Sequence, residues 1–134
     1  MRYIEEEDGK LIFRENGETV MVEAWGKDSL RVRSCMLGEI QDVNAALLMP
    51  QEEGEVKICI ADDGGEAVLQ NGKITARMKV QPWGNKLQIT FLNQKDEILL
   101  QEIEGGGALT LNARQYKALH GGKYRLKVSF ISNP

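Results

Sequence analysis

The stretch from Gly65 to Ile103, GEAVLQNGKITARMKVQPWGNKLQITFLNQKDEILLQEI, decides the fold because apolar and polar residues alternate along most of it. A period of two is typical of half-buried β-strands. Lys73 to Val80 and Lys86 to Leu92 are the clearest strands, and Asn71-Gly72 suits a two-residue hairpin turn. The side chains expected to point inward are Ile74, Ala76, Met78, Val80, Leu87, Ile89 and Phe91. This part of the chain therefore predicts an antiparallel β-meander.

A meander with one apolar face is stable only when that face packs against another layer. The rest of the chain offers further alternating runs, which are Lys10–Glu15, Glu18–Trp25, Asp28–Leu37, Gly54–Ile60 and Lys123–Ser132. Asn16-Gly17 joins the first two as a second hairpin signal. With 134 residues and about nine or ten strands, we expect one all-β domain over residues 1–134, an antiparallel β-sandwich.

The segments between these runs give less regular patterns. We expect residues 1–9 to be a solvated lead-in ended by Asp8-Gly9, and residues 38–53 to be a loop with one helical turn. Ala108–Asn112 is a short strand candidate, and Ala113–His120 is the best helix candidate, closed by Gly121-Gly122. The fold would thus contain at most one or two short helical turns. Within Asp28–Leu37 we expect the side chains of Arg31, Arg33 and Cys35 to face water.

Charge and hydropathy exclude several classes of protein. The formal net charge is −3 with both signs interspersed, so there is no basic surface for nucleic acid or for an anionic membrane. The N-terminus lacks an apolar signal core, and no run of eighteen apolar residues occurs. We therefore expect a soluble, cytoplasmic protein. Cys35 and Cys59 stand in strand-like runs without metal-ligand spacing, which predicts reduced, half-buried thiols.

No motif for catalysis, for a metal or for a cofactor is present. His120 is the only histidine, and a position at a helix end explains it without chemistry. The glycines of 105–107 read as a turn rather than a phosphate-binding loop. Asp62, Asp63 and Glu66 are compatible with calcium, but acids at a turn are usually solvated, so we predict no metal site.

Two tryptophans are the only candidates for ligand contact. Trp25 and Trp83 each precede a glycine at the end of a strand, in W-G-K and W-G-N. An aromatic ring at such a position can stack on a sugar, or it can pack over the rim of the core. Both interpretations stay open from the sequence.

Three runs also resemble a known family. AVLQNGKITARM (67–78), GNKLQITFLNQKDEILLQE (84–102) and KYRLKVSFISNP (123–134) resemble the N-terminal β-sandwich domain of glycoside hydrolase family 31, the α-glucosidases and α-xylosidases. DSLRVRS (28–34) is similar to an early strand of that domain, so the resemblance spans nearly the whole chain. It implies a galactose mutarotase-like sandwich placed before a catalytic (β/α)8 barrel, which carries an aspartate nucleophile and an aspartate acid/base.

No catalytic residue can be transferred to this chain, because such a barrel needs about 250 residues and 134 are already filled by strands. The resemblance implies a non-catalytic domain that packs on the barrel of an enzyme acting on α-linked glucosides or xylosides. Pro82–Asn85 and Asp62–Gly65 are the candidate loops for its substrate entrance. The strong strand before Asn133-Pro134 fits a domain cut from a longer enzyme, inactive by itself.

Two other functions are compatible with the sequence. The first is an autonomous carbohydrate-binding module that uses Trp25 or Trp83 as a stacking platform. The second is a free-standing mutarotase-like enzyme, which needs a general acid and a general base across a pocket. With a single histidine, the second function has the weaker support.

Overall fold

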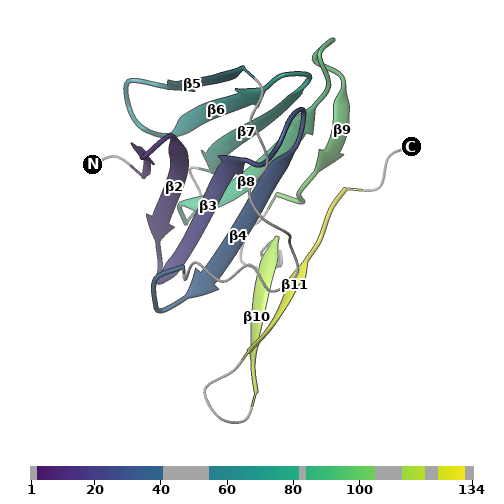
Figure 1. The fold of residues 1–134 in the computed structure, drawn as a ribbon. Coiled ribbons are helices and arrows are strands. Elements are labelled where there is room, and N and C mark those ends of the chain that lie inside the picture. The colour runs from purple at the N-terminus through teal and green to yellow at the C-terminus, as the bar shows by residue number, and fades with distance from the viewer. Residues whose placement is uncertain (1–2, 41–54, 82–83, 105–112, 120–123, 132–134) are drawn as a thin grey trace.

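Two antiparallel sheets and one hairpin form the fold (Figure 1). The computed structural model describes residues 3–40, 55–81, 84–104, 113–119 and 124–131. The four-stranded sheet has the order β1 (Ile4–Glu7), β2 (Lys10–Glu15), β3 (Glu18–Ala24), β4 (Leu30–Met36). The five-stranded sheet has the order β5 (Val56–Ile60), β6 (Glu66–Asn71), β7 (Ile74–Gln81), β8 (Lys86–Leu92), β9 (Ile98–Gln101). The hairpin pairs β10 (Arg114–Ala118) with β11 (Tyr124–Val128).

The apolar faces of the two sheets meet in one core. Its fully or almost fully buried members are Ile4, Leu11, Phe13, Val20, Val22, Ala67, Leu69, Ala76, Met78, Leu87 and Ile89. In each strand these residues are two positions apart, as alternation requires. The predicted all-β sandwich is therefore confirmed, and among the described residues no helix is long and apolar enough to cross a lipid bilayer.

Two-residue turns set the register of the first sheet. Asn16 and Gly17 have φ angles of 56° and 80°, and their positive values match the twist of a hairpin. Asp8 and Gly9 do the same with 51° and 76°, joining β1 to β2. The predicted turn at Asp8-Gly9 and the exposure of Glu5–Glu7 are confirmed, but the expectation of an unstructured lead-in is wrong for residues 4–7, which form β1 with Ile4 fully buried.

The turn predicted at Asn71-Gly72 lies one residue further along the chain. Asn71 pairs with Ile74, so the two turn residues are Gly72 and Lys73, and Gly72 has a φ of 62°. Asn71 itself is fully buried, and its amide nitrogen donates to the carbonyls of Gly26 (2.8 Å) and Ser29 (2.7 Å). The side chain of Asn71 thus fastens the β3–β4 turn to the second sheet.

The outer face of β4 was expected to be exposed to solvent, but its arginines are largely covered. Arg31 and Arg33 pair with Glu23 of β3 at 2.5 and 2.9 Å, and the side chain of Glu23 is only 6% exposed. By contrast, Val32 on the inner face remains 39% exposed. The two arginines of β4 are thus neutralised by Glu23 of β3, while the inner face of β4 is left partly exposed at Val32.

The helix predicted for Ala113–His120 is wrong, since Arg114–Ala118 is strand β10. Its register runs from Arg114 opposite Val128 to Ala118 opposite Tyr124. Pairing with β11 satisfies this backbone, and the alternation of Arg114 and Tyr116 with Gln115 and Lys117 was the overlooked signal. The predicted loop at residues 41–53, the strand Ala108–Asn112 and the glycines 105–107 lie outside the described residues.

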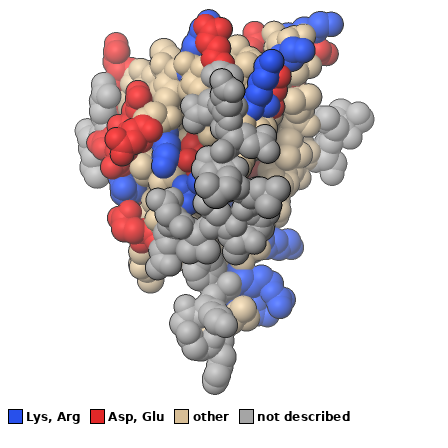
Figure 2. Space-filling model, in the orientation of Figure 1, with Lys and Arg blue, Asp and Glu red and all other residues tan. Residues whose placement is uncertain are grey.

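The hairpin of β10 and β11 extends beyond the end of the two sheets (Figure 1). Eleven strands are described, which is more than the nine or ten expected from the sequence. Basic side chains gather over this hairpin (Figure 2), and its exposed members include Lys117, Arg125 and Lys127. The hairpin and β4 lie on either side of the cavity described next.

Candidate functional site

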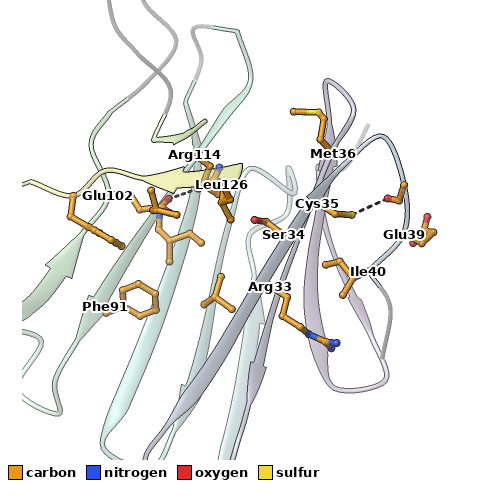
Figure 3. A pocket seen from close by; sticks show the side chains of 15 residues that line it. Arg33, Ser34, Cys35, Met36, Glu39, Ile40, Phe91, Glu102, Arg114 and Leu126 are labelled. Atoms are coloured by element: carbon orange, nitrogen blue, oxygen red, sulfur yellow. Dashed lines mark hydrogen bonds and ion pairs between the residues drawn. The ribbon is translucent and has the colours of Figure 1, made fainter. Parts of the chain in front are cut away.

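A groove of about 640 Å³ lies between β4 on one side and β8 and β11 on the other. We call it the β4–β11 groove. Its lining residues are Val32, Arg33, Ser34, Cys35, Met36, Gly38, Glu39, Ile40, Ile89, Phe91, Glu102, Arg114, Leu126, Val128 and Phe130. Figure 3 shows Phe91, Glu102, Arg114 and Leu126 on one side and Cys35, Glu39 and Ile40 on the other. Its volume is within the range of ligand-binding clefts, about 300–1,000 Å³.

The walls of the groove are mainly apolar and reach the solvent. Val32 is 39% exposed, while Leu126 and Phe130 are each 38% exposed. Deeper in, Ile89 belongs to the buried core and Phe91 packs against it. The groove is thus a continuation of the sandwich core that opens outward.

A buried ion cluster forms the polar end of this groove. The guanidinium of Arg114 donates two hydrogen bonds to the carboxylate of Glu18, at 2.8 and 3.2 Å, and a third to Glu102. It also donates to the Leu87 carbonyl at 3.1 Å, and the hydroxyl of Tyr116 donates to Glu18 at 2.8 Å. Arg114 therefore joins β10 to both sheets, because Glu18 begins β3 and Glu102 follows β9.

Two carboxylates share one guanidinium, and the burial of this cluster shifts the pKa of Glu102, Arg114 and Tyr116. Burial raises the pKa of Glu102, and the negative charge of Glu18 raises it further. Arg114 and the Ile89 N–H lower this pKa, but by less, so the net shift is upward. Burial alone would lower the pKa of Arg114, but the two carboxylates raise it above its ordinary value. Burial also raises the pKa of Tyr116. Within this cluster Glu102 is the carboxylate that burial inclines toward the neutral form.

The cluster is suited to holding structure rather than to acid–base chemistry. Glu102 accepts hydrogen bonds from Arg114 and from the Ile89 N–H at 2.9 Å, so it is already engaged. Among the other lining residues, Cys35 places its Sγ 3.2 Å from the Gly38 carbonyl, and burial raises the pKa of its thiol. A raised thiol pKa disfavours the nucleophilic thiolate.

The structure describes one of the two tryptophan candidates. Trp25 is half-buried, and the guanidinium carbon of Arg31 lies 3.7 Å from the centre of its ring. This cation–π contact occupies one face of the indole, and only the other face could stack on a sugar. Trp83 lies outside the described residues, as does His120. Sugar stacking by either tryptophan stays a prediction.

The other sequence candidates lie away from the groove. Asp62 and Asp63 are exposed in the β5–β6 turn, where Asp63 accepts a hydrogen bond from the Gly65 N–H at 2.8 Å. Among the described residues, no group of three histidine, cysteine, aspartate or glutamate side chains is placed to hold a metal ion. Cys59 is an exposed free thiol on β5, and Cys35 is a half-buried one on β4.

The sequence interpretation missed both the groove and the ion cluster. Glu18 and Arg114 are 96 residues apart, so no local spacing links them. Glu102 ends an apolar run, but Leu100, two positions before it, is itself 42% exposed, so the local pattern does not show that Glu102 is buried. A carboxylate at an inward position requires a buried partner, but the sequence does not say which one.

Comparison with known proteins identifies relatives of this chain. No family model matches the sequence. The chain is 35% identical over 130 residues to an uncharacterized family 31 glucosidase, ORF2, of Pseudescherichia vulneris. That match covers 84% of this chain and 23% of the relative.

A solved structure gives the same answer for the fold. The crystal structure of a family 31 α-xylosidase from a soil metagenome, complexed with xylose, superposes with a TM-score of 0.80 at 30% sequence identity. The superposition covers 98% of this chain and 21% of the xylosidase. The resemblance seen in the sequence is confirmed, and this chain is homologous to a part of the family 31 glycoside hydrolases that spans about a fifth of their length.

Proposed function

We propose that this chain acts as a non-catalytic β-sandwich domain of a family 31 α-glycosidase, an α-glucosidase or an α-xylosidase. The observation that carries the proposal is the superposition of 98% of the chain on only 21% of an α-xylosidase. A segment that matches so completely while leaving most of the enzyme unmatched behaves as one structural unit of it. The chemistry then belongs to the remainder, a catalytic barrel that acts on α-linked glucosides or xylosides.

Exposed apolar side chains support a packing role. Among the described residues, Ile98, Leu99 and Leu100 of β9 are each more than 40% exposed. Phe130 and Ile131 are exposed as well, and they lie beside β9 because the Ile131 N–H donates to the Gln101 carbonyl at 2.7 Å. Clustered apolar side chains on a surface are typical of an interface.

One end of the five-stranded sheet is the proposed contribution to the substrate entrance. The β5–β6 turn, residues 61–65, and Gly84 and Asn85 between β7 and β8 lie at the same end because successive antiparallel strands reverse direction. Pro82 and Trp83 of the predicted loop lie outside the described residues. The β2–β3 turn joins them there, since the Asn16 side chain donates to the Gly84 carbonyl at 3.0 Å. We propose that one of the two predicted loops, Asp62–Gly65 or Pro82–Asn85, reaches the substrate from this end.

A domain exchange tests the proposal. This chain replaces the matched fifth of the soil-metagenome α-xylosidase, and hydrolysis of an aryl α-xyloside is measured for the chimera, for the xylosidase without that fifth, and for this chain alone. We expect activity from the chimera only. A chimera that folds but is as inactive as the truncated enzyme would overturn the proposal.

A further inference from the structure

We propose that the outward face of the β10–β11 hairpin binds the acidic strand β1 of a second copy of this chain, and that two copies pair symmetrically through this contact. The inference goes beyond the proposed function and does not depend on it, because it uses only the charges of this chain.

Acidic and basic residues are separated along the chain. The last of the 20 acidic residues is Glu104, whereas five of the 17 basic residues lie between positions 114 and 127. Residues 105–134 therefore carry no acidic side chain. A basic segment attached to an otherwise acidic chain is typical of a segment that contacts an acidic partner.

The register of the hairpin gathers three of these cations on one face. Lys117 lies directly opposite Arg125, and Lys127 lies opposite Gln115, two positions further along both strands. Directly opposite residues of an antiparallel pair project from the same face. The residues that alternate with them, such as Leu126, line the β4–β11 groove, so the three cations point away from it. All three are exposed, within the basic surface seen in Figure 2.

The pairing of Lys117 with Arg125 is unfavourable within the isolated chain. Like charges directly opposite each other in a strand pair are destabilising. Among the described residues, neither side chain forms an ion pair with a carboxylate that would offset this repulsion. A local conflict of this kind is typical of a functional surface, and a carboxylate from outside the chain would relieve it.

Strand β1 presents the matching negative charge. Its residues Glu5–Glu7 are consecutive and exposed, and they pair with Lys10–Ile12 in the first half of β2. The hairpin is anchored beyond the other end of β2, where Arg114 donates to Glu18 at the start of β3. Figure 1 accordingly shows β1 beside the N-terminus and the hairpin extending away from it. The acids of β1 can therefore reach the hairpin of another copy but not their own.

A two-fold arrangement uses both surfaces of each copy. When two copies lie antiparallel, each hairpin meets β1 of the other, so the contact is made twice and the assembly closes as a dimer. Ion pairs between exposed side chains are individually weak, and the repeated contact adds their contributions. Such an interface must weaken as the salt concentration rises.

Sedimentation equilibrium tests the inference at about 20 mM and at about 500 mM salt. We expect a dimer at the lower concentration and a monomer at the higher one. Lys117→Glu combined with Arg125→Glu should raise the dissociation constant of the dimer by about tenfold or more, and so should Glu5→Lys combined with Glu6→Lys. An equimolar mixture of these two double variants should restore the dimer, because every basic surface again meets an acidic one.

A matched control changes the net charge by the same amount elsewhere. Lys57→Glu combined with Lys95→Glu alters two exposed lysines on β5 and in the β8–β9 turn, and it should leave the dimer intact. Far-UV circular dichroism checks that all three double variants fold.

Three results would overturn the inference. A chain that stays monomeric at low salt would show that the hairpin does not bind a second copy. A dimer that survives both charge reversals would form through another surface. A monomeric chain whose hairpin variant loses stability only in the xylosidase chimera would assign the cations to a contact with the rest of the enzyme. An active chimera combined with any of these results would uphold the proposed function while rejecting the dimer.

Discussion

The two sides of the sandwich are held together by different forces. On the closed side, formed by β1–β3 over β5–β7, side chains such as Phe13, Leu69 and Met78 are at most 1% exposed and form one apolar cluster. On the open side, formed by β4, β8, β9 and β11, the groove leaves apolar walls exposed, and Arg114 links the sheets through Glu18 and Glu102. Apolar packing needs two complementary faces, and the described residues supply both on one side only.

The ion cluster gives the largest expected effect. Arg114→Met removes the guanidinium that two buried carboxylates share. Breaking a buried pair by removing one partner typically costs about 3–5 kcal/mol, so we expect a loss of that size in the free energy of unfolding. Urea denaturation at pH 7 measures it.

Arg125→Met provides the matched control, because Arg125 is an exposed arginine on the same hairpin. Its loss should change stability by no more than about 0.5 kcal/mol. If both variants unfold at the same urea concentration, the cluster does not hold the open side together.

Leucine truncation compares the two sides directly. Leu69→Ala removes a fully buried side chain from the closed side, which should cost about 2–5 kcal/mol. Leu126→Ala removes one that is 38% exposed in the groove, which should cost under about 1 kcal/mol. Equal losses in urea denaturation would contradict the division into a closed and an open side.

Leu69→Ala and Leu126→Ala can also be compared within the xylosidase chimera. If the rest of the enzyme packs over the groove and buries Leu126, Leu126→Ala should cost nearly as much as Leu69→Ala. A cost that does not change between the isolated chain and the chimera would indicate that the groove stays open there.

The closed side could be predicted from the sequence and the open side could not. The sequence predicts strands such as Lys73–Val80 and Lys86–Leu92 because alternation of apolar and polar residues is a local property. The Asn-Gly dipeptide at 16–17 is likewise a local signal for a turn. Local patterns gave a wrong secondary structure where long-range strand pairing determines it. Ala113–His120 followed by Gly121-Gly122 suggests a helix and its C-terminal end, yet pairing with β11 and the ion cluster make Arg114–Ala118 a strand.

The candidate site was not predictable for a physical reason. The ion cluster forms only when three separate segments of the chain meet, those of Glu18, Glu102 and Arg114. The sequence around one charged residue does not indicate which distant residue it will pair with. The family resemblance succeeded because it depends on the order and spacing of whole strands. It could not show the β4–β11 groove, because that depends on how β4, β8 and β11 come together in three dimensions.

A glycine on the closed side gives the third effect. Gly72 has a positive φ, and a Cβ there would lie 2.0 Å from the carboxylate of Asp28, which accepts the Lys73 N–H at 2.7 Å. Gly72→Ala should therefore cost about 2–3 kcal/mol, from backbone strain and from the lost hydrogen bond.

Gly9→Ala separates these two causes. Gly9 also has a positive φ, but nothing lies within 4 Å of a Cβ added to it. This control should lose only the backbone contribution, about 1 kcal/mol. Equal losses in thermal or urea unfolding would mean that the contact between Asp28 and the β6–β7 turn does not stabilise the closed side.

The smallest expected effect is a difference between the two sides in how the free energy of unfolding depends on pH. Because the pKa of Glu102 is raised in the folded protein, the folded state binds this proton more tightly than the unfolded state above pH 4.5. The contribution of Glu102 to stability therefore falls as pH rises from 4.5 through its raised pKa. Glu102→Gln lacks this titration, so the stability of the original chain minus that of the variant should decrease as pH rises through this raised pKa and level off above it.

The same difference for Leu69→Ala should stay constant with pH, because that substitution on the closed side removes no ionisable group. Urea titrations of the three proteins between pH 4.5 and 7.5 measure both differences. A difference for Glu102→Gln that increases with pH would mean that attraction to Arg114 outweighs the cost of burying the carboxylate. The open side would then be held together by net electrostatic attraction, and because the cluster is buried, salt would weaken this attraction much less than it weakens exposed ion pairs.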